Sequence, residues 1–137
     1  MNDNLHIEIV TPDNLFFEGN ADELILPAFD GEIGILPGHA TMIVALIPGE
    51  LRIKIGDETR YASISDGYAQ IEIDNVIVVV GSAEKPQQID INRAQKSLAR
   101  AEQRVKDPQT SERERERSLR SIMRSKARIK MAKKIIE

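Results

Sequence analysis

The sequence predicts a β-rich front over residues 1–84, folded as an antiparallel sandwich or barrel, followed by an α-helical hairpin over residues 85–137. Three observations support this division. Apolar and polar residues alternate in the front, turn signals separate its short apolar runs, and after Gly81 the apolar spacing becomes that of helices. Antiparallel pairing is favoured because the short connections leave no room for the helices that parallel crossovers require.

The first strand illustrates the alternation in the front. Leu5, Ile7 and Ile9 share one face, polar residues occupy most of the other, and Thr11-Pro12 ends the strand. Further short strands are expected, each bounded by a turn signal of the Asp-Gly, Pro-Gly or Asp-Asn kind. They lie at residues 15–17, 23–27, 32–36, 41–47, 50–55, 59–65, 68–73 and 76–80.

The tail predicts two helices. Asp90 is a suitable N-cap for the first, and Asp107-Pro108 ends it. Ser111 and Glu114 have the spacing of a capping box for the second. The first helix carries apolar residues on one face, at Ala94, Leu98, Ala101 and Val105. This interface is thin and rich in alanine, so we expect the hairpin to open more easily than the front domain.

Charge is divided along the chain. Residues 1–83 contain 14 acidic and 3 basic residues, whereas residues 111–137 contain 4 acidic and 10 basic residues, within a net charge of −3. Such asymmetry is typical of a basic tail that meets an acidic partner. The chain has no cysteine, and its longest apolar run, residues 42–47, is far shorter than a membrane helix requires.

Catalytic and metal chemistry find little support. His6 lies in an expected strand and His39 follows a Pro-Gly turn, and neither has a nearby nucleophile in the sequence. The glycines of residues 31–34 are interpreted as turn residues, because no Gly-Lys-Ser/Thr follows them. No metal-ligand spacing stands out. We therefore expect no catalytic residue and no metal site.

The basic charge of the tail raises the question of nucleic-acid binding. Residues 111–117 alternate basic and acidic residues, the tail has no aromatic residue for base stacking, and the acidic front would repel phosphate. Nucleic-acid binding is therefore disfavoured. A stand-alone binding module, whose basic helical tail docks an acidic protein or a nucleic acid, remains the alternative function.

Both predicted helices carry arginines that a folded hairpin could bring close together. Arg93 and Arg100 lie on the first helix, and Arg124 and Arg128 lie four apart on one face of the second. A folded hairpin could bring these guanidinium groups together to bind a polyphosphate, with Glu84 or Asp90 bonding a sugar hydroxyl or an amine. Ordinary surface arginines are the alternative, and spacing alone favours it.

Residues 31–40, Gly-Glu-Ile-Gly-Ile-Leu-Pro-Gly-His-Ala, resemble the signature loop of the epsilon subunit of bacterial F-type ATP synthases. The resemblance covers essentially the whole chain and implies a ten-stranded β-sandwich followed by a helical hairpin, with no active site. It also implies a rotor subunit at the cytoplasmic face of the bacterial inner membrane, held there only through the complex. The expected partners are the gamma subunit, the c ring, which Glu32 and His39 would contact, and the alpha/beta hexamer.

The resemblance further implies a mobile tail. When extended, the tail would enter the alpha/beta hexamer and block ATP hydrolysis while the complex couples proton transport to ATP synthesis. The basic residues assigned to this inhibition are Arg113, Arg115, Arg117 and Arg120.

Some members of this family bind ATP in the folded hairpin through an Ile/Leu-Asp-x-x-Arg-Ala motif. Ile89, Asp90, Arg93 and Ala94 match this motif. Glu84 and Arg100 also align with the family pattern. On the second helix the arginine pair is Arg124/Arg128 or, in a competing register, Arg120/Arg124. ATP is thus expected as a regulatory ligand, and no cofactor is required.

Overall fold

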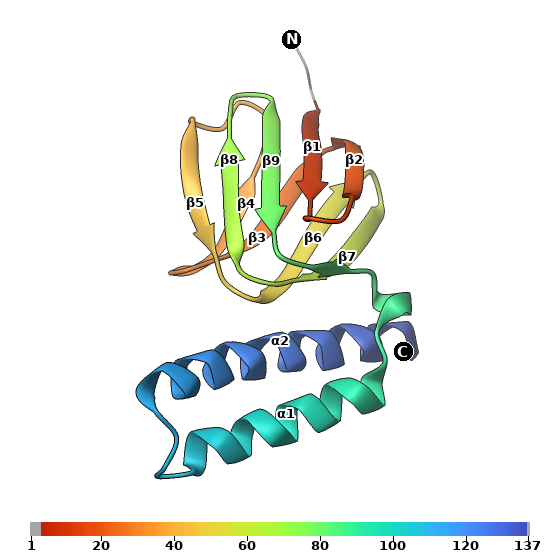
Figure 1. The fold of residues 1–137 in the computed structure, drawn as a ribbon. Coiled ribbons are helices and arrows are strands. Elements are labelled where there is room, and N and C mark those ends of the chain that lie inside the picture. Colours follow the sequence, from red (N-terminus) through yellow and green to blue (C-terminus); the bar gives the residue numbers. More distant parts are fainter. Residues whose placement is uncertain (1–3, 137) are drawn as a thin grey trace.

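The computed structural model describes residues 4–136, and ten strands lie within them (Figure 1). Their bounds are β1 Leu5–Val10, β2 Leu15–Ala21, β3 Glu23–Ala28, β4 Gly31–Ile35, β5 Met42–Leu46, β6 Gly49–Ile55, β7 Glu58–Ile64, β8 Gly67–Ile71, β9 Asn75–Val80 and β10 Ala83–Glu84. A short 3-10 helix, η1 (Pro86–Gln88), leads to the helices α1 (Ile91–Lys106) and α2 (Glu112–Ile136). The predicted fold class, a β-sandwich followed by a helical hairpin, is confirmed.

The strands form a single sheet that wraps on itself. Its order is β10-β7-β6-β3-β5-β8-β9-β1-β2, and β4 pairs separately with β3. All pairings are antiparallel except β1 with β9, which are parallel. This parallel pair needs no crossover helix, because the whole of β2 to β8 forms the connection between its two strands.

The hydrophobic core fills the space between the two halves of the wrapped sheet. Strand alternation sends one set of side chains inward from each strand, and Leu5, Ile7 and Ile9 of β1 are fully buried, as the sequence predicts. Leu24, Leu26, Leu51, Ile71 and Val78 complete its centre from other strands. The sandwich therefore has a core that does not depend on the helices.

The helices begin where the sequence indicates. Asp90 Oδ1 accepts a hydrogen bond from Arg93 N–H at 3.1 Å, so Asp90 is the N-cap of α1. Ser111 Oγ accepts from Glu114 N–H at 3.2 Å and starts α2 in the same way. These caps satisfy backbone donors that have no partner within the helix.

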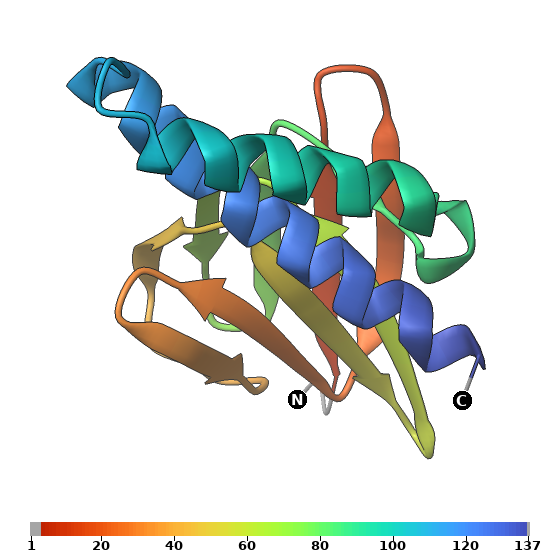
Figure 2. The same cartoon turned by 90° about the horizontal axis from the view of Figure 1, so that it is seen from below.

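The hairpin lies across one end of the sandwich in two layers. Helix α2 lies between the sandwich and α1, and the two helices run antiparallel (Figures 1 and 2). Their contact is built from small residues, with Ala94 and Ala101 of α1 and Ser118 and Ser125 of α2 all buried. Small side chains let the helices approach closely while burying little apolar surface. Among the helices of residues 4–136, none combines the length and apolarity needed to span a membrane.

Two elements were not predicted. Strand β10 has two residues, too few to show alternation, and exists because it pairs with Ser63 and Ile64 of β7. Element η1 follows it directly. Strand β2 also extends past the predicted residue 17 to Ala21, because its register with β1 carries it through Gly19 and Asn20, which as a pair resemble a turn.

Candidate functional site

A polar hollow of about 360 Å³ lies where the sandwich, α1 and α2 meet. Its volume falls in the usual range for small-molecule sites. The lining residues are Ser82, Glu84, Arg93, Ser97, Ser121, Arg124, Ser125 and Arg128. Four of the eight residues predicted for ATP are thus brought together: Glu84, Arg93, Arg124 and Arg128.

Glu84 and Arg128 form the central ion pair of the hollow. Arg128 Nη2 donates to Glu84 Oε2 at 3.1 Å, and Arg128 Nε lies 2.7 Å from Glu84 Oε1. The Nε contact is electrostatic, since this buried N–H is not directed at a hydrogen-bond acceptor. Both side chains are mostly buried, at 22% and 30% exposed. The pair joins strand β10 to helix α2.

The other two guanidinium groups of the hollow belong to Arg93 and Arg124. Neither Arg93 nor Arg124 forms an ion pair with any carboxylate described in the structure. Three arginines and one glutamate leave the hollow with an excess of positive charge, and this suits an anion of several charges.

Four serines of this hollow were not identified from the sequence: Ser82, Ser97, Ser121 and Ser125. Their hydroxyls add small donors and acceptors between the arginines. Ser121 and Ser125 precede Arg124 and Arg128 by three residues each, so the signal was present as a repeated Ser-x-x-Arg spacing that puts each pair on one helical face.

Three residues of the Ile/Leu-Asp-x-x-Arg-Ala motif, namely Ile89, Asp90 and Ala94, have structural roles next to the hollow. Asp90 is occupied as the N-cap of α1. Ala94 is fully buried against α2, where a larger residue would hold the helices apart. Ile89 is half-buried and ends η1. These three residues position Arg93 and do not themselves line the hollow.

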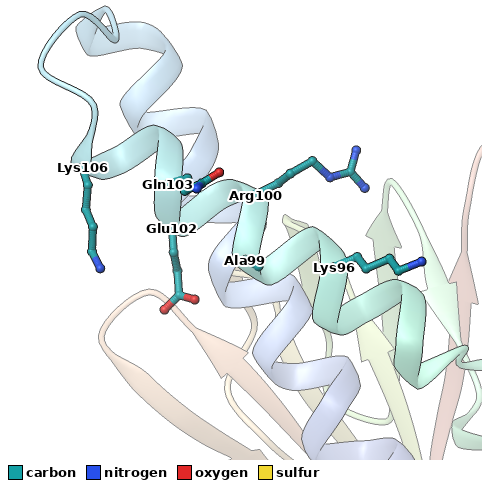
Figure 3. A pocket seen from close by; sticks show the side chains of 6 residues that line it. All are labelled: Lys96, Ala99, Arg100, Glu102, Gln103 and Lys106. Atoms are coloured by element: carbon teal, nitrogen blue, oxygen red, sulfur yellow. The ribbon is translucent and has the colours of Figure 1, made fainter.

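Arg100 is separated from the other arginines. It lies two turns after Arg93 and lines a shallow hollow on the outer side of α1, together with Lys96, Gln103 and Lys106 (Figure 3). Between the two registers considered for α2, the hollow is lined by Arg124 and Arg128, and Arg120 is exposed outside it.

Glu32 and His39 lie at opposite ends of strand β4. Glu32 is paired opposite Pro27 near the start of β4, and its Oε1 accepts from Arg52 Nη2 at 3.0 Å. His39 lies in the loop after β4, where its Nδ1 is 2.8 Å from Ala40 O. This loop is tied to the β8–β9 connection by Gly38 N–H, which donates to Ile73 O at 2.6 Å.

Large apolar side chains are exposed around these positions. Phe29 is 80% exposed in the β3–β4 turn, Ile43 is 72% exposed on β5, and Ile73 is 61% exposed beside the His39 loop. Leu36, Met42 and Tyr68 are also exposed in this region of the sandwich. Large exposed apolar side chains of this kind occur at protein–protein docking surfaces.

Arg52 connects the sandwich surface to the hairpin. Its Nη1 donates to Glu50 Oε1 at 3.1 Å, and Glu50, only 7% exposed, also lies 3.9 Å from Lys130 Nζ of α2. The hydrogen bond to Glu32 raises the pKa of Arg52 above its ordinary value; burial opposes this rise, and the hydrogen bond to Glu50 adds to it.

The four arginines assigned to inhibition do not share one environment. Arg113, Arg117 and Arg120 are exposed. Arg115 instead donates from Nε to Val105 O and from Nη2 to Asp107 O, both at 3.3 Å. These carbonyls lie at the end of α1, so Arg115 caps that helix in the folded hairpin.

Known protein families match the two parts of the chain separately. A family model described as ATP synthase, Delta/Epsilon chain, beta-sandwich domain matches residues 4–86, and the corresponding long alpha-helix domain matches residues 87–133. The ATP synthase epsilon chain of Ruminococcus albus is 38% identical over 129 residues, which cover 93% of this chain and 96% of that protein. The epsilon chain of Koribacter versatilis is 41% identical over 105 residues, covering 77% and 74% of the two chains.

A solved structure has the same fold at low sequence identity. A chain in the mitochondrial ATP synthase of Euglena gracilis superposes with a TM-score of 0.81 at 18% identity, covering 100% of this chain and 84% of that chain. The two family models, which together span residues 4–133, and the bacterial relatives agree in their names. The chain therefore belongs to the epsilon-chain family of bacterial F-type ATP synthases.

Proposed function

We propose that this chain is the epsilon subunit of a rotor, a non-catalytic part of an ATP synthase that couples proton transport to ATP synthesis. Its sandwich docks on the gamma subunit and the c ring, and its hairpin regulates ATP hydrolysis in the alpha/beta hexamer. In this role the chain lies at the cytoplasmic face of the bacterial membrane and is held there by the complex. The observation that carries the rotor role is the match of both parts of the chain to the ATP synthase delta/epsilon family models. The observation that carries the regulatory role is the junction hollow, where three arginines meet one glutamate between the sandwich and both helices.

ATP is the regulatory ligand of the hairpin in this proposal. Arg93 comes from α1, and Arg124 and Arg128 come from α2, so one polyphosphate bound between them would hold the helices together. A ligand that binds only the folded hairpin shifts the population toward that form by its difference in affinity for the two states. ATP would thereby withhold the inhibitor from the hexamer.

Calorimetric titration of the full chain with ATP and Mg²⁺ tests this site. Arg93→Ala and Arg124→Ala should each weaken binding by at least about tenfold, since each removes a charge-assisted contact worth roughly 1.5 kcal/mol or more. Arg104→Ala is the control, because Arg104 is exposed in the last turn of α1 away from the hollow. Equal loss of affinity in all three variants would contradict the assignment.

The position of Arg100 allows a finer test. It lies outside the hollow, so it contacts the nucleotide only if its long side chain turns toward Arg93. The family pattern includes Arg100 in the ATP site, and on that assignment Arg100→Ala should weaken ATP binding. Unchanged affinity in Arg100→Ala would remove Arg100 from the site while leaving the hollow itself in place.

Inhibition is assigned to the exposed basic face of α2. The triple variant Arg113→Gln, Arg117→Gln and Arg120→Gln should relieve inhibition of hydrolysis in the reassembled complex, because attraction between the tail and acidic segments of the hexamer would be lost. Arg115 is left unchanged since it caps α1. A triple glutamine variant at Lys96, Arg104 and Lys106 of α1 controls for general loss of charge. Full inhibition of hydrolysis by the α2 variant would show that the exposed basic face of α2 is not the inhibitory surface.

Docking of the sandwich is assigned to the exposed apolar region that contains Phe29, Ile43 and Ile73, together with Glu32 and His39. Ile43→Asp should abolish copurification with gamma, while Leu15→Asp, at an exposed leucine on β2, should not. Copurification also separates this function from the alternative of a stand-alone binding module. The alternative is not favoured, since both parts of the chain match the ATP synthase family.

A further inference from the structure

Strands β1 and β2 pair as an antiparallel hairpin of the sandwich (Figure 1). Four polar side chains lie on the outward face of this hairpin. His6 and Glu8 are two apart on β1 and thus share a face, opposite the buried Leu5, Ile7 and Ile9. On β2, Glu18 pairs directly opposite Glu8, and Asn20 pairs directly opposite His6. Two carboxylates and one imidazole therefore converge at one point of the surface.

The separations between their polar atoms match those of ligands around one metal ion. His6 Nε2 lies 3.6 Å from Glu8 Oε1 and 3.4 Å from Glu18 Oε2. Ligand atoms around tetrahedral Zn²⁺ are separated by about 3.3–3.6 Å, given metal–ligand bonds of about 2.0–2.2 Å. All three ligand atoms lie within 4.8 Å of one another, so one ion placed between them is within reach of all three side chains.

Asn20 orients the imidazole. Its Oδ1, which can only accept, lies 3.2 Å from His6 Nδ1. In neutral His6 the proton is therefore on Nδ1, and the lone pair of Nε2 faces the two carboxylates. A hydrogen bond of this kind to the distal nitrogen is the usual support of a metal-binding histidine.

This arrangement has an electrostatic cost when nothing lies between the three groups. Glu8 and Glu18 are like charges directly opposite each other on paired strands, a destabilising arrangement. Neutral His6 adds a third acceptor to the same point. A cation bound between the three groups removes the repulsion.

We propose that His6, Glu8 and Glu18 form a binding site for Zn²⁺, with a fourth position open to water. One imidazole nitrogen with two carboxylate oxygens suits Zn²⁺, whereas Ca²⁺ and Mg²⁺ require six or more ligands, nearly all oxygen. The site is separate from the arginine hollow and does not depend on the proposed role of the hairpin. Since β2 is the last strand of the sheet, the ion would fasten this edge strand to β1.

Sequence spacing did not indicate this site. Glu18 is ten residues beyond Glu8 and enters the site only through the register of the β1–β2 pairing. His6, Glu8 and Glu18 do not form a recognisable metal-ligand spacing along the chain, and the sequence therefore predicted no metal site. A hairpin register places residues of two strands side by side at spacings that no local motif encodes.

Calorimetric titration of the metal-free full chain with ZnCl₂ tests the proposal. The expected result is one equivalent bound, with affinity lowered at least tenfold in His6→Ala and in Glu18→Gln. His39→Ala is the matched control, because His39 is the second of the two histidines of the chain, and it should bind as the wild type does. Asn20→Ala should retain the stoichiometry and lose about tenfold in affinity, as loss of an outer hydrogen bond does.

Three results would overturn the proposal. They are Zn²⁺ affinity unchanged by His6→Ala and Glu18→Gln, equal affinity for Mg²⁺ and Zn²⁺, and no binding at all. In the last case, an imidazole NMR titration that shows His6 protonated at neutral pH would identify the block as a proton-bridged ion-pair cluster. Glu18→Gln replaces an exposed carboxylate by its neutral isostere, so the test does not depend on whether His6→Ala folds normally.

Discussion

Arg128 of helix α2 and Glu84 of strand β10 form an ion pair across 44 positions of sequence, with Arg128 Nη2 donating to Glu84 Oε2 at 3.1 Å. Strand β10 is part of the sandwich sheet, so this pair fastens the second helix to the sandwich. The contact lies inside the hollow proposed for ATP. Glu84 and Arg128 therefore both attach the hairpin to the sandwich and line the proposed ATP site.

Loss of this ion pair should loosen the hairpin. Glu84→Gln removes the charge and keeps the size, and we expect α2 to lose protection by about 1–2 kcal/mol, a value reduced for the partial exposure of both side chains. Hydrogen exchange of the α2 amides measures this change. Glu116→Gln, an exposed carboxylate on the same helix, is the control. Equal protection in both variants would mean that the pair contributes nothing to docking.

The close approach of the helices should fail when a small residue is enlarged. Ala101 is 2% exposed between α1 and α2, and Ala101→Leu should destabilise the hairpin by about 1–3 kcal/mol through overpacking. Ala99→Leu, at an exposed position of the same helix, adds the same atoms and should have little effect. Hydrogen exchange should show the loss in both helices, with the sandwich strands unchanged. Loss throughout the protein would show that hairpin and sandwich unfold together.

Arg52 should stabilise the sandwich surface through the buried Glu50. Arg52→Met leaves Glu50 without its main cationic partner, and we expect a loss of about 2–3 kcal/mol in urea unfolding. Arg60→Met is the control, because Arg60 on the next strand pairs with the exposed Glu58 at 3.1 Å. A similar loss in both variants would contradict the role of burial.

The pH dependence of the Arg52 contribution follows from its raised pKa. Because the folded pKa lies above the unfolded value, the stabilisation is complete below the unfolded pKa and is lost only as the pH rises through the folded one. Since even the unfolded pKa of arginine lies far above neutral, the stability difference between wild type and Arg52→Met should be unchanged by Arg52 titration from about pH 6 to about pH 9. Urea unfolding at several pH values checks this, and a marked decline toward pH 9 would be inconsistent with it.

Gly67 should tolerate no side chain. A Cβ at Gly67 would collide with Val79 O and lie 2.8 Å from Val80 Cα, and both of these are backbone atoms of β9. Gly67→Ala should therefore destabilise the sandwich by about 3 kcal/mol or more, measured as a lower urea midpoint. At Gly19 the nearest atom is the end of the Phe17 ring at 3.3 Å, so Gly19→Ala is the milder comparison. Similar midpoints for the two variants would show that β9 can shift away.

Local patterns account for most of the fold. Alternation predicted that Leu5, Ile7 and Ile9 face the core, and Asp90 and Ser111 were recognised as caps because capping depends on groups three residues away. Strand β10 could not be found in this way. Its two residues are a strand only because β7 offers them a partner.

By itself, the sequence determined the order of the two parts, the opposite charges of front and tail, and the arginine spacings on each helix. These follow from periods of two and of three to four residues, which every local segment carries. The tertiary structure alone decided which charges meet. It joined Glu84 to Arg128, left Arg100 outside the hollow, assigned Arg115 to the end of α1, and set Glu18 opposite Glu8. The physical reason is that such pairings depend on strand register and helix packing, and both arise from burial summed over the whole chain.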